Sequence, residues 1–237
     1  PSSTGSDRKR AFMKTVHRIY FADARDMSAV ADESVDLVVT SPPYPMIAMW
    51  DEIFRNTDAN IDAALKEQDG NRAFELMHRR LDAVWAEVFR ILKKGGFACI
   101  NIGDAVRTLK DRFTLYPNHA RILSGLYAKG FNPLPAVIWR KQTNAPSKFM
   151  GAGMLPAGAY VTLEHEYILI VRRGDKRIFK AGPETQARRE SAFFWEERNL
   201  WFSDVWMDVK GARQNTCNKT IRDRSASFPF DIPYRLS

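Results

Sequence analysis

The sequence predicts an α/β fold in which a sheet carries helices on both faces. Two apolar segments, Val35–Thr40 and Phe97–Ile102, have the character typical of strands that are buried on both faces. An amphipathic helix is predicted between them, and helices and strands alternate again downstream. The chain has 237 residues, of which 45% are hydrophobic and 27% are charged, so we expect a folded domain and not a disordered chain.

The first part of the chain is predicted to alternate short strands with turns. Arg18–Phe21 predicts a short strand, and Ala24–Ala31 a turn or a short helix. Val35–Thr40 follows as a central strand. It ends at Ser41–Tyr44, because the two prolines there cannot donate to a strand ladder. Pro45–Gly70 is expected to be a long irregular connection.

A long helix is the clearest element in the middle of the chain. Across Asn71–Lys94, apolar residues recur at spacings of three and four, as on one face of a helix. Lys93 and Lys94 would complement the C-terminal dipole, and Gly95–Gly96 would end the helix before the next strand. The apolar positions are Phe74, Met77, Leu81, Val84, Trp85, Val88 and Leu92.

The elements that follow continue the alternation of helices and strands. Pro117–Lys129 predicts a second helix, which ends at Gly130. Leu134–Trp139 and Tyr167–Val171 predict two strands, and we expect them to be neighbours in the sheet.

A change of composition divides the chain into three parts. Residues 172–224 hold 13 Lys and Arg against 8 Asp and Glu, with poor periodicity and a cluster of aromatic residues. We therefore predict a core at residues 1–171, an inserted irregular region at residues 172–224 and a return to the core at residues 225–237.

The composition also excludes several classes of protein. No apolar stretch reaches the roughly 18 residues of a membrane-spanning helix. Pro1–Arg10 is polar and basic, which predicts a flexible arm and not a secretory signal. Two cysteines cannot build a disulfide framework, so we expect a cytoplasmic protein. A net charge of +8 and a pI near 9.6 favour a polyanionic partner, with nucleic acid as the leading candidate.

Ser41–Tyr44 is the segment best suited to chemistry. It lies at the carboxyl end of a predicted buried strand, where open α/β sheets bind ligands. The Ser41 hydroxyl and the Pro42 carbonyl form an acceptor pair that suits an amino group, and Tyr44 offers a flat face for a planar base. A stiff turn with a packed tyrosine would have the same four residues, so the segment alone leaves both interpretations open.

A wider comparison of these residues favours the chemical interpretation. Asp36–Tyr44 resembles the catalytic motif of the amino-group DNA methyltransferases, in the TSPPY form typical of the cytosine-N4 branch. Ser225–Leu236 resembles a second family segment, which is rich in Phe-Pro and borders the S-adenosylmethionine site. The order of the two segments resembles the circularly permuted β group. The resemblance extends from Arg18 to Leu236.

The resemblance implies a fold, a reaction and a set of site residues. The fold would be the Rossmann-like sheet of S-adenosylmethionine-dependent methyltransferases, with residues 172–224 as its target-recognition region. The enzyme would transfer a methyl group to N4 of an extruded cytosine in double-stranded DNA. It would belong to a restriction-modification system and would be associated with the nucleoid of a bacterium or an archaeon. The implied catalytic residues are Ser41, Pro42, Pro43 and Tyr44, and the implied cofactor-binding residues are Asp23, Thr40, Phe228 and Pro229.

One family feature is not found in the sequence. The loop Asp-Pro-Phe-x-Gly-x-Gly, which holds the methionine part of the cofactor in the β group, does not occur before Ser237. Gly151–Gly153 follows no convincing strand and opens no helix, so it is no substitute. We therefore expect a fold that is incomplete at its C-terminus, with weak cofactor binding unless a further segment or a second chain completes the site.

The basic region is the candidate for DNA contacts. Its arginines and lysines could reach phosphates or guanine edges, or they could form a solvated face over a small aromatic core made by Trp195, Trp201 and Trp206. The candidates are Arg172, Arg173, Arg177, Lys180, Arg188, Arg189 and Arg213.

Metal and thiol chemistry are not expected. His119 and His165 have no metal-ligand spacing with the cysteines, and the amine attack needs no metal. Cys99 and Cys217 lack the preceding proline found at a cytosine-C5 nucleophile, and a buried inert thiol is expected at Cys99. Two alternatives to cytosine-N4 transfer remain: adenine-N6 transfer, and a DNA-binding module without catalysis.

Overall fold

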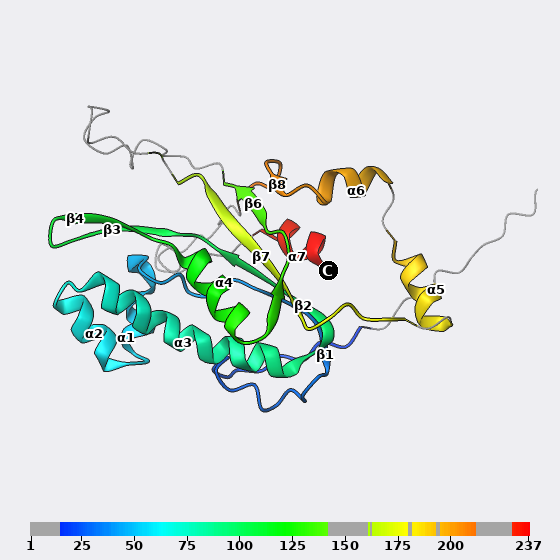
Figure 1. Cartoon of the computed structure of the whole chain (residues 1–237), viewed down its shortest axis with the longest axis horizontal. Coiled ribbons are helices and arrows are strands. Elements are labelled where there is room, and N and C mark those ends of the chain that lie inside the picture. The colour runs from blue at the N-terminus through cyan, green and yellow to red at the C-terminus, as the bar shows by residue number, and fades with distance from the viewer. Residues whose placement is uncertain (1–14, 142–160, 162, 180–181, 193–194, 212–228) are drawn as a thin grey trace, which may run out of the picture.

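The computed structural model describes residues 15–141, 161, 163–179, 182–192, 195–211 and 229–237. Its main sheet has six strands, and five of them follow the order β1-β2-β7-β6-β8, while β5 pairs with β7 (Figure 1). The strands of this sheet are β1 (Val35–Thr40), β2 (Leu92–Ile102), β5 (Phe131–Pro133), β6 (Val137–Arg140), β7 (His165–Arg173) and β8 (Val205–Trp206).

The main sheet is mixed, because it contains both parallel and antiparallel strand pairs. β1 and β2 are parallel, and Val39 lies beside Cys99 in their register. β7 is antiparallel to both β2 and β6, while β8 is parallel to β6. The predicted neighbourhood of the strands near residues 137 and 168 is therefore confirmed, because Val137 pairs with Ile168.

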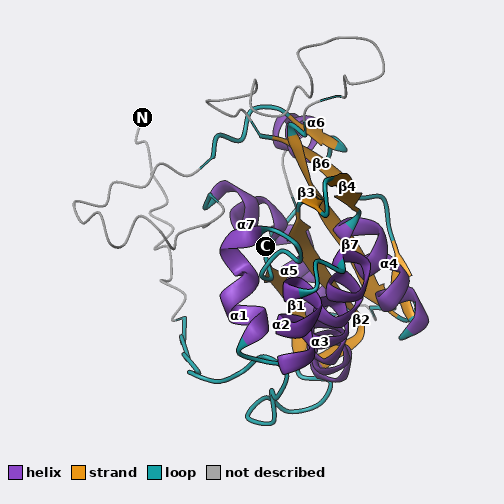
Figure 2. Cartoon of the chain, turned by 90° about the vertical axis from the view of Figure 1, so that its left-hand side faces the viewer, coloured by secondary structure: helices purple, strands orange, loops and turns teal. Residues whose placement is uncertain are grey.

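Helices cover both faces of the sheet, as the sequence predicts, and Figure 2 shows the strands between them. A separate hairpin extends from the end of β2, formed by β3 (Ala105–Leu109) and β4 (Arg112–Tyr116). The helices are η1 (Ala48–Trp50), α1 (Asp51–Arg55), α2 (Ala59–Lys66), α3 (Gly70–Ile91), α4 (Asn118–Ala128), α5 (Pro183–Glu190), α6 (Trp195–Trp201) and α7 (Asp231–Leu236).

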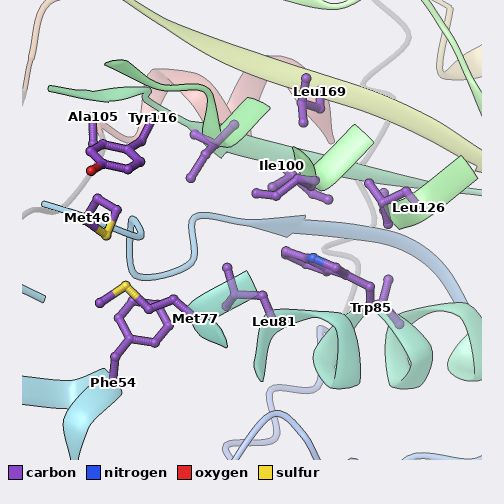
Figure 3. Packing of buried hydrophobic residues seen from close by; sticks show 14 of the residues in the cluster. Met46, Phe54, Met77, Leu81, Trp85, Ile100, Ala105, Tyr116, Leu126 and Leu169 are labelled. Carbon is purple, nitrogen blue, oxygen red and sulfur yellow. The ribbon is translucent and has the colours of Figure 1, made fainter. Parts of the chain in front are cut away.

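The two faces carry two hydrophobic cores because successive residues of a strand point to opposite sides. On the first face, Met77, Leu81 and Trp85 of α3 pack towards Ile100 of β2 and Leu169 of β7 (Figure 3). The adjacent residues of the same strands, such as Cys99 and Ile168, belong to a second, smaller core on the other face. Its buried members are Cys99, Val137, Trp139, Ile168, Trp206, Val209 and Ile232, and the last of these comes from α7.

The junction between α3 and β2 differs from the prediction. The helix ends at Ile91, not at Gly95–Gly96, and β2 begins at Leu92. Leu92 is fully buried and pairs with Val35, so tertiary pairing overrides the helical spacing there. The two glycines instead lie at a change of register between β1 and β2, where Gly95 has a φ of +75° that favours glycine.

Two further predictions for the N-terminal part are wrong. Arg18–Phe21 pairs with no strand in the described part of the chain, and the Phe21 side chain is 97% exposed. Pro45–Gly70 is not irregular, because η1, α1 and α2 lie within it. Asp58 caps α2 by accepting a hydrogen bond from the Asn60 N–H, and Ile61 of that helix is buried against the core.

The bounds of several other predicted elements are confirmed, but β1 is not the central, fully buried strand that we expected. In the part of the chain that the structure describes, β1 lies at the edge of the main sheet, pairs with β2 alone and is mostly half-buried. β1, the body of α3 and α4 follow the predicted segments closely, and β7 includes the predicted strand at residues 167–171. The hairpin β3–β4 had no counterpart in the prediction. Among the described residues, no helix has the length and apolar character needed to cross a membrane.

Candidate active site

The Ser-Pro-Pro-Tyr segment begins where β1 ends. β1 finishes at Thr40, and the chain then turns through half-buried Ser41, buried Pro42 and half-buried Tyr44. The turn takes Tyr44 to the end of the neighbouring strand β2, against Gly103 and Asn101. The segment therefore lies at the edge formed by the carboxyl ends of the parallel pair β1 and β2, as the sequence predicts.

Tyr44 is the centre of a hydrogen-bond network. Its hydroxyl accepts from Ser41 Oγ at 3.3 Å and from Asn101 Nδ2 at 2.8 Å, and it donates to Glu166 Oε2 at 2.8 Å. Asn101 Nδ2 also donates to Glu166 Oε2 at 2.7 Å. The second oxygen of Glu166 accepts from Lys141 Nζ at 2.5 Å. Three segments thus meet at the Tyr44 phenol, namely the loop after β1, β2 and β7, and Lys141 after β6 joins the network through Glu166.

The Tyr44 phenol stays protonated. Its burial and the negative charge of Glu166 both raise its pKa well above the ordinary value. The ring is also fixed at its side, because a Cβ placed on Gly103 would lie 3.1 Å from Tyr44 Cε2 and 3.2 Å from Glu166 Cγ. A side chain at residue 103 would therefore press on Tyr44 and Glu166, which would have to shift by a few tenths of an ångström.

A cavity of about 340 Å³ opens beside this network. Such a volume suits a small planar ligand such as a nucleobase. The cavity has apolar walls with charged groups at its rim. Its lining comprises Tyr44, Met46, Ile47, Ala48, Gly103, Asp104, Ala105, Val106, Arg107, Lys141, Leu163, Glu164, His165 and Glu166.

Two histidines lie near this cavity but contact different partners. Asp104 lines the cavity and accepts from the His119 ring at 2.8 Å, and the His119 ring stacks on Tyr167 at 3.9 Å between centroids. His165 meets the edge of Tyr167 and lines the cavity. In the described part of the chain, no group of His, Cys, Asp and Glu could hold a metal ion.

The described residues expected to bind the cofactor come from three segments: the loop before β1, the end of β1 and the residues just before α7. Asp23 is exposed and bonds Arg25, which lowers the pKa of its carboxyl to about 2. Thr40 is the half-buried last residue of β1. Pro229 is buried just before α7, whose Ile232 packs in the same core as Leu37 and Val39. Phe228 lies outside the described residues.

The basic residues expected at DNA fall into two groups. Arg172 and Arg173 belong to β7, and Arg173 binds Glu33 at 3.0 Å and the Leu92 carbonyl. Arg177 pairs with Asp36 at 2.7 Å. By contrast, Arg188 and Arg189 lie on the exposed helix α5, with Arg188 over the Phe179 ring.

The structure describes only part of the remaining residues of the basic region. Lys180 and Arg213 lie outside the described residues. Trp206 is buried in the second core of the main sheet, whereas Trp201 is half-buried and Trp195 is 67% exposed, so the three tryptophans do not form the small separate core that was the alternative. Cys99 is buried, as expected, and burial raises the pKa of its thiol to about 12.

The sequence did not single out the groups that hold Tyr44. Asn101, Lys141 and Glu166 are ordinary polar residues in the sequence, and 122 residues separate Glu166 from Tyr44. One indication was available for two of them. Glu166 occupies a strand position where an apolar residue is expected, and Asn101 interrupts an otherwise apolar strand.

A family model matches most of the chain. The model of the N6/N4 methyltransferase family, described as DNA methylase, matches residues 35–236. This chain belongs to the DNA methylase family. The match begins at the first residue of β1, so the Ser-Pro-Pro-Tyr turn, Asn101 and Glu166 all lie within the methylase region.

Two curated methylases are similar over nearly all of the chain. The type II methyltransferase M.MthZI of Methanothermobacter thermautotrophicus is 53% identical over 225 residues, which cover 94% of this chain and 63% of that protein. The type II methyltransferase M.MjaI of Methanocaldococcus jannaschii is 46% identical over 94% of this chain and 75% of that protein. The chain therefore spans 63% of the length of the first relative and 75% of the length of the second.

Solved structures of methylases have the same fold. TTHA0409 of Thermus thermophilus, a DNA modification methylase crystallised with S-adenosyl-L-methionine, superposes with a TM-score of 0.66 at 29% identity, over 93% of this chain and 73% of that one. The cytosine-N4-specific PvuII DNA methyltransferase superposes with a TM-score of 0.58 at 14% identity, over 92% of this chain and 67% of that one. The second likeness is one of fold alone.

Proposed function

We propose that this methylase transfers a methyl group from S-adenosylmethionine to the exocyclic N4 of cytosine in duplex DNA. The observation that carries the proposal is the Ser41–Tyr44 turn at the end of β1, with Tyr44 fixed beside a cavity large enough for one base. We further propose a β-group arrangement and a place in a restriction-modification system. The similarity to two type II methyltransferases supports the second point.

The residues of the site would activate and hold the amine. An exocyclic amine is a weak nucleophile because its lone pair is delocalised into the ring. Hydrogen bonds to Ser41 Oγ and the Pro42 carbonyl would draw the nitrogen towards a tetrahedral geometry. Tyr44 would stack on the extruded base, and the acceleration would come from this positioning and from electrostatics. The protonated amine then loses a proton to solvent without a dedicated base.

The chemistry of the groups around β1 fits the nucleoside half of the proposed cofactor. Asp23 is ionised at neutral pH and could accept from an amino or hydroxyl group, Thr40 offers a hydroxyl, and Pro229 offers an apolar surface. When bound, S-adenosylmethionine supplies a methyl group on a positively charged sulfur. The completion of its methionine subsite by a further segment or a second chain stays a prediction.

For DNA contacts we propose the exposed pair Arg188 and Arg189 of α5 first. Arg172, Arg173 and Arg177 remain candidates, although each already bonds a group of its own chain. Lys180 and Arg213 are proposed from the sequence alone. Contacts to phosphates from such residues would position the duplex without reading its sequence.

Adenine-N6 transfer is the alternative reaction, because the same pair of acceptors would hold the amine of adenine. The serine of the motif supports cytosine, since an aspartate at position 41 would have favoured adenine. A DNA-binding module without catalysis is the alternative from another class. It would bind DNA in a salt-dependent way and would show no affinity for S-adenosylmethionine in a calorimetric titration.

Replacing Ser41 tests the proposed mechanism. Ser41→Ala in the full-length protein should lower methyl transfer to unmethylated DNA by about 10²-fold or more, because the amine loses one of its two acceptors. The fold and the affinity for DNA should not change. Transfer of tritiated methyl groups measures the rate, and thermal unfolding and DNA titration provide the controls. A turnover equal to that of the unsubstituted protein would remove Ser41 from the mechanism.

A further inference from the structure

The hydrogen bonds through Tyr44 run in one direction. Ser41 Oγ donates to the Tyr44 hydroxyl, and that hydroxyl donates to Glu166 Oε2. An ionised carboxylate can only accept, so Glu166 fixes the last step of the chain of donors. Asn101 Nδ2 donates to both Tyr44 and Glu166, so the Tyr44 proton has only Glu166 Oε2 and Ser41 Oγ as acceptors in this network, and Glu166 is the nearer, at 2.8 Å against 3.3 Å.

Lys141 is the positive charge that faces Glu166. Glu166 is only 8% exposed, and a buried carboxylate needs a compensating charge or several donors. Lys141 Nζ supplies the charge at 2.5 Å, on the oxygen that Tyr44 does not use. A protonated or amide side chain at this position could donate to Tyr44 and so reverse the direction of the hydrogen bonds.

The direction has a consequence for Ser41. Its hydroxyl proton is engaged by Tyr44, so the lone pairs of Ser41 Oγ remain for a ligand. The Pro42 carbonyl can only accept in any case. Ser41 is therefore the member of the acceptor pair whose role depends on its neighbours, and Glu166 determines that role through Tyr44.

We propose that Glu166, held by Lys141, is a positioning and specificity residue that makes Ser41 an acceptor for an amino group. This proposal rests on the proposed methyl transfer to an exocyclic amine. A base with a carbonyl at the same ring position, such as uracil or thymine, would place an acceptor against an acceptor. The network would thus exclude bases that cannot be methylated there.

A kinetic cycle tests whether Glu166 acts through Tyr44. Glu166→Gln in the full-length protein should lower kcat by about 10- to 10²-fold, with the KM for DNA within about twofold of the unsubstituted value. In a Tyr44→Phe background, Glu166→Gln should change kcat by no more than about twofold, since the connection is already broken. Glu166→Asp should restore part of the rate. Glu67→Gln is the matched control, because it removes a surface carboxylate just after α2 that pairs with Arg72 in the first turn of α3.

A binding ratio measures specificity directly. The target site of the full-length protein would first be mapped. Two duplexes with this site would then be compared, one with cytosine and one with uracil at the methylated position. The unsubstituted protein should prefer cytosine by about tenfold, and Glu166→Gln should lose most of this preference. If Glu166 acts on the fold alone, Glu166→Gln would weaken the binding of both duplexes equally. An unchanged ratio, or rate losses that multiply in the double variant, would overturn the inference.

Failure of the proposed function would be visible separately. A full-length protein that transfers no methyl group to any base contradicts the methyltransferase proposal itself. The coupling free energy between Tyr44 and Glu166 can then still be measured by urea unfolding of Tyr44→Phe, Glu166→Gln and the double variant. Additive effects on stability would show that the two side chains are not coupled, whatever the reaction.

Discussion

Protonation at single residues decides what the polar groups of this member of the DNA methylase family can do. The pKa of Tyr44 is raised, first by burial and then by Glu166, so Tyr44 is a hydrogen-bond donor and cannot act as a base near neutral pH. Asp23 has the opposite shift, because Arg25 lowers its pKa to about 2 and keeps it ionised. Tyr44 and Asp23 therefore each keep one protonation state near neutral pH.

His78 makes a prediction for stability. It is buried on α3 and bonds Asn118, and burial lowers its pKa to about 4 from an ordinary 6.5. The unfolded chain therefore binds a proton more readily, and stability should fall as the pH drops from 6.5 to 4. The loss should be at most about 3 kcal/mol, and His78→Gln should remove it. Urea unfolding at several pH values measures this difference.

The control for this experiment is the same substitution at an exposed histidine. His17→Gln should leave the pH dependence unchanged, because His17 is exposed to solvent. Equal slopes for His78→Gln and the unsubstituted protein between pH 6.5 and 4 would mean that His78 does not stay neutral in the fold.

Residues of the site differ in how far the sequence could predict them. Ser41 and Tyr44 were found because their neighbours form one local motif. Glu166 was not, because its role depends on the antiparallel pairing of β7, which brings it beside Asn101 and Tyr44. Local spacing carries no information about such a contact between residues far apart in the chain.

At the scale of elements, strand pairing and burial set the bounds of helices and strands wherever the local sequence pattern predicted them wrongly. The helical spacing of α3 continues to Leu92, yet Leu92 begins β2 because it pairs with Val35 of β1. Gly95–Gly96 looked like a helix stop and is a change of register inside a strand. The helices at residues 48–66 depend similarly on burial against α3, which their short sequences do not reveal.

The contact between α3 and the hairpin gives a prediction at this scale. Gly70 begins α3, and a Cβ there would lie 1.9 Å from Tyr116 Oη and 2.9 Å from Leu109 Cδ1. Gly70→Ala should therefore destabilise the protein by about 1–3 kcal/mol, although alanine favours helices. Tyr116→Phe should recover part of this loss in the double variant, because it removes the nearest atom. Chemical denaturation of the four proteins measures the effect.

A gain in stability for Gly70→Ala would contradict this account of the packing. It would mean that helix propensity outweighs the clash and that the hairpin moves away at little cost. Equal losses for Gly70→Ala with and without the Tyr116 hydroxyl would place the strain at Leu109 instead.

The charge of the whole molecule concerns its partner more than its fold. The net charge of +8 suits a polyanion, and α5 presents Arg188 and Arg189 to solvent. Replacing both with alanine should weaken binding to duplex DNA of any sequence. The slope of log affinity against log salt should also fall by about 0.9 for each phosphate that the variant no longer neutralises. Fluorescence anisotropy at several salt concentrations measures both quantities.

A charge-matched variant distinguishes direct binding to phosphates from a general field effect. Replacing Lys66 and Arg79 with alanine removes the same two charges from α2 and α3, where each pairs with a carboxylate. If this variant shows the same decrease in affinity and slope as the α5 variant, α5 does not contact the DNA backbone.

The identity of the methylated base tests the central claim most directly. The full-length protein would be incubated with unmethylated duplex DNA and S-adenosylmethionine, and the DNA digested to nucleosides and analysed by mass spectrometry. The proposed role of Ser41 and its neighbours predicts N4-methylcytosine. N6-methyladenine would keep the fold and the amine chemistry but contradict the base, and DNA binding without any methylated base would contradict the enzyme.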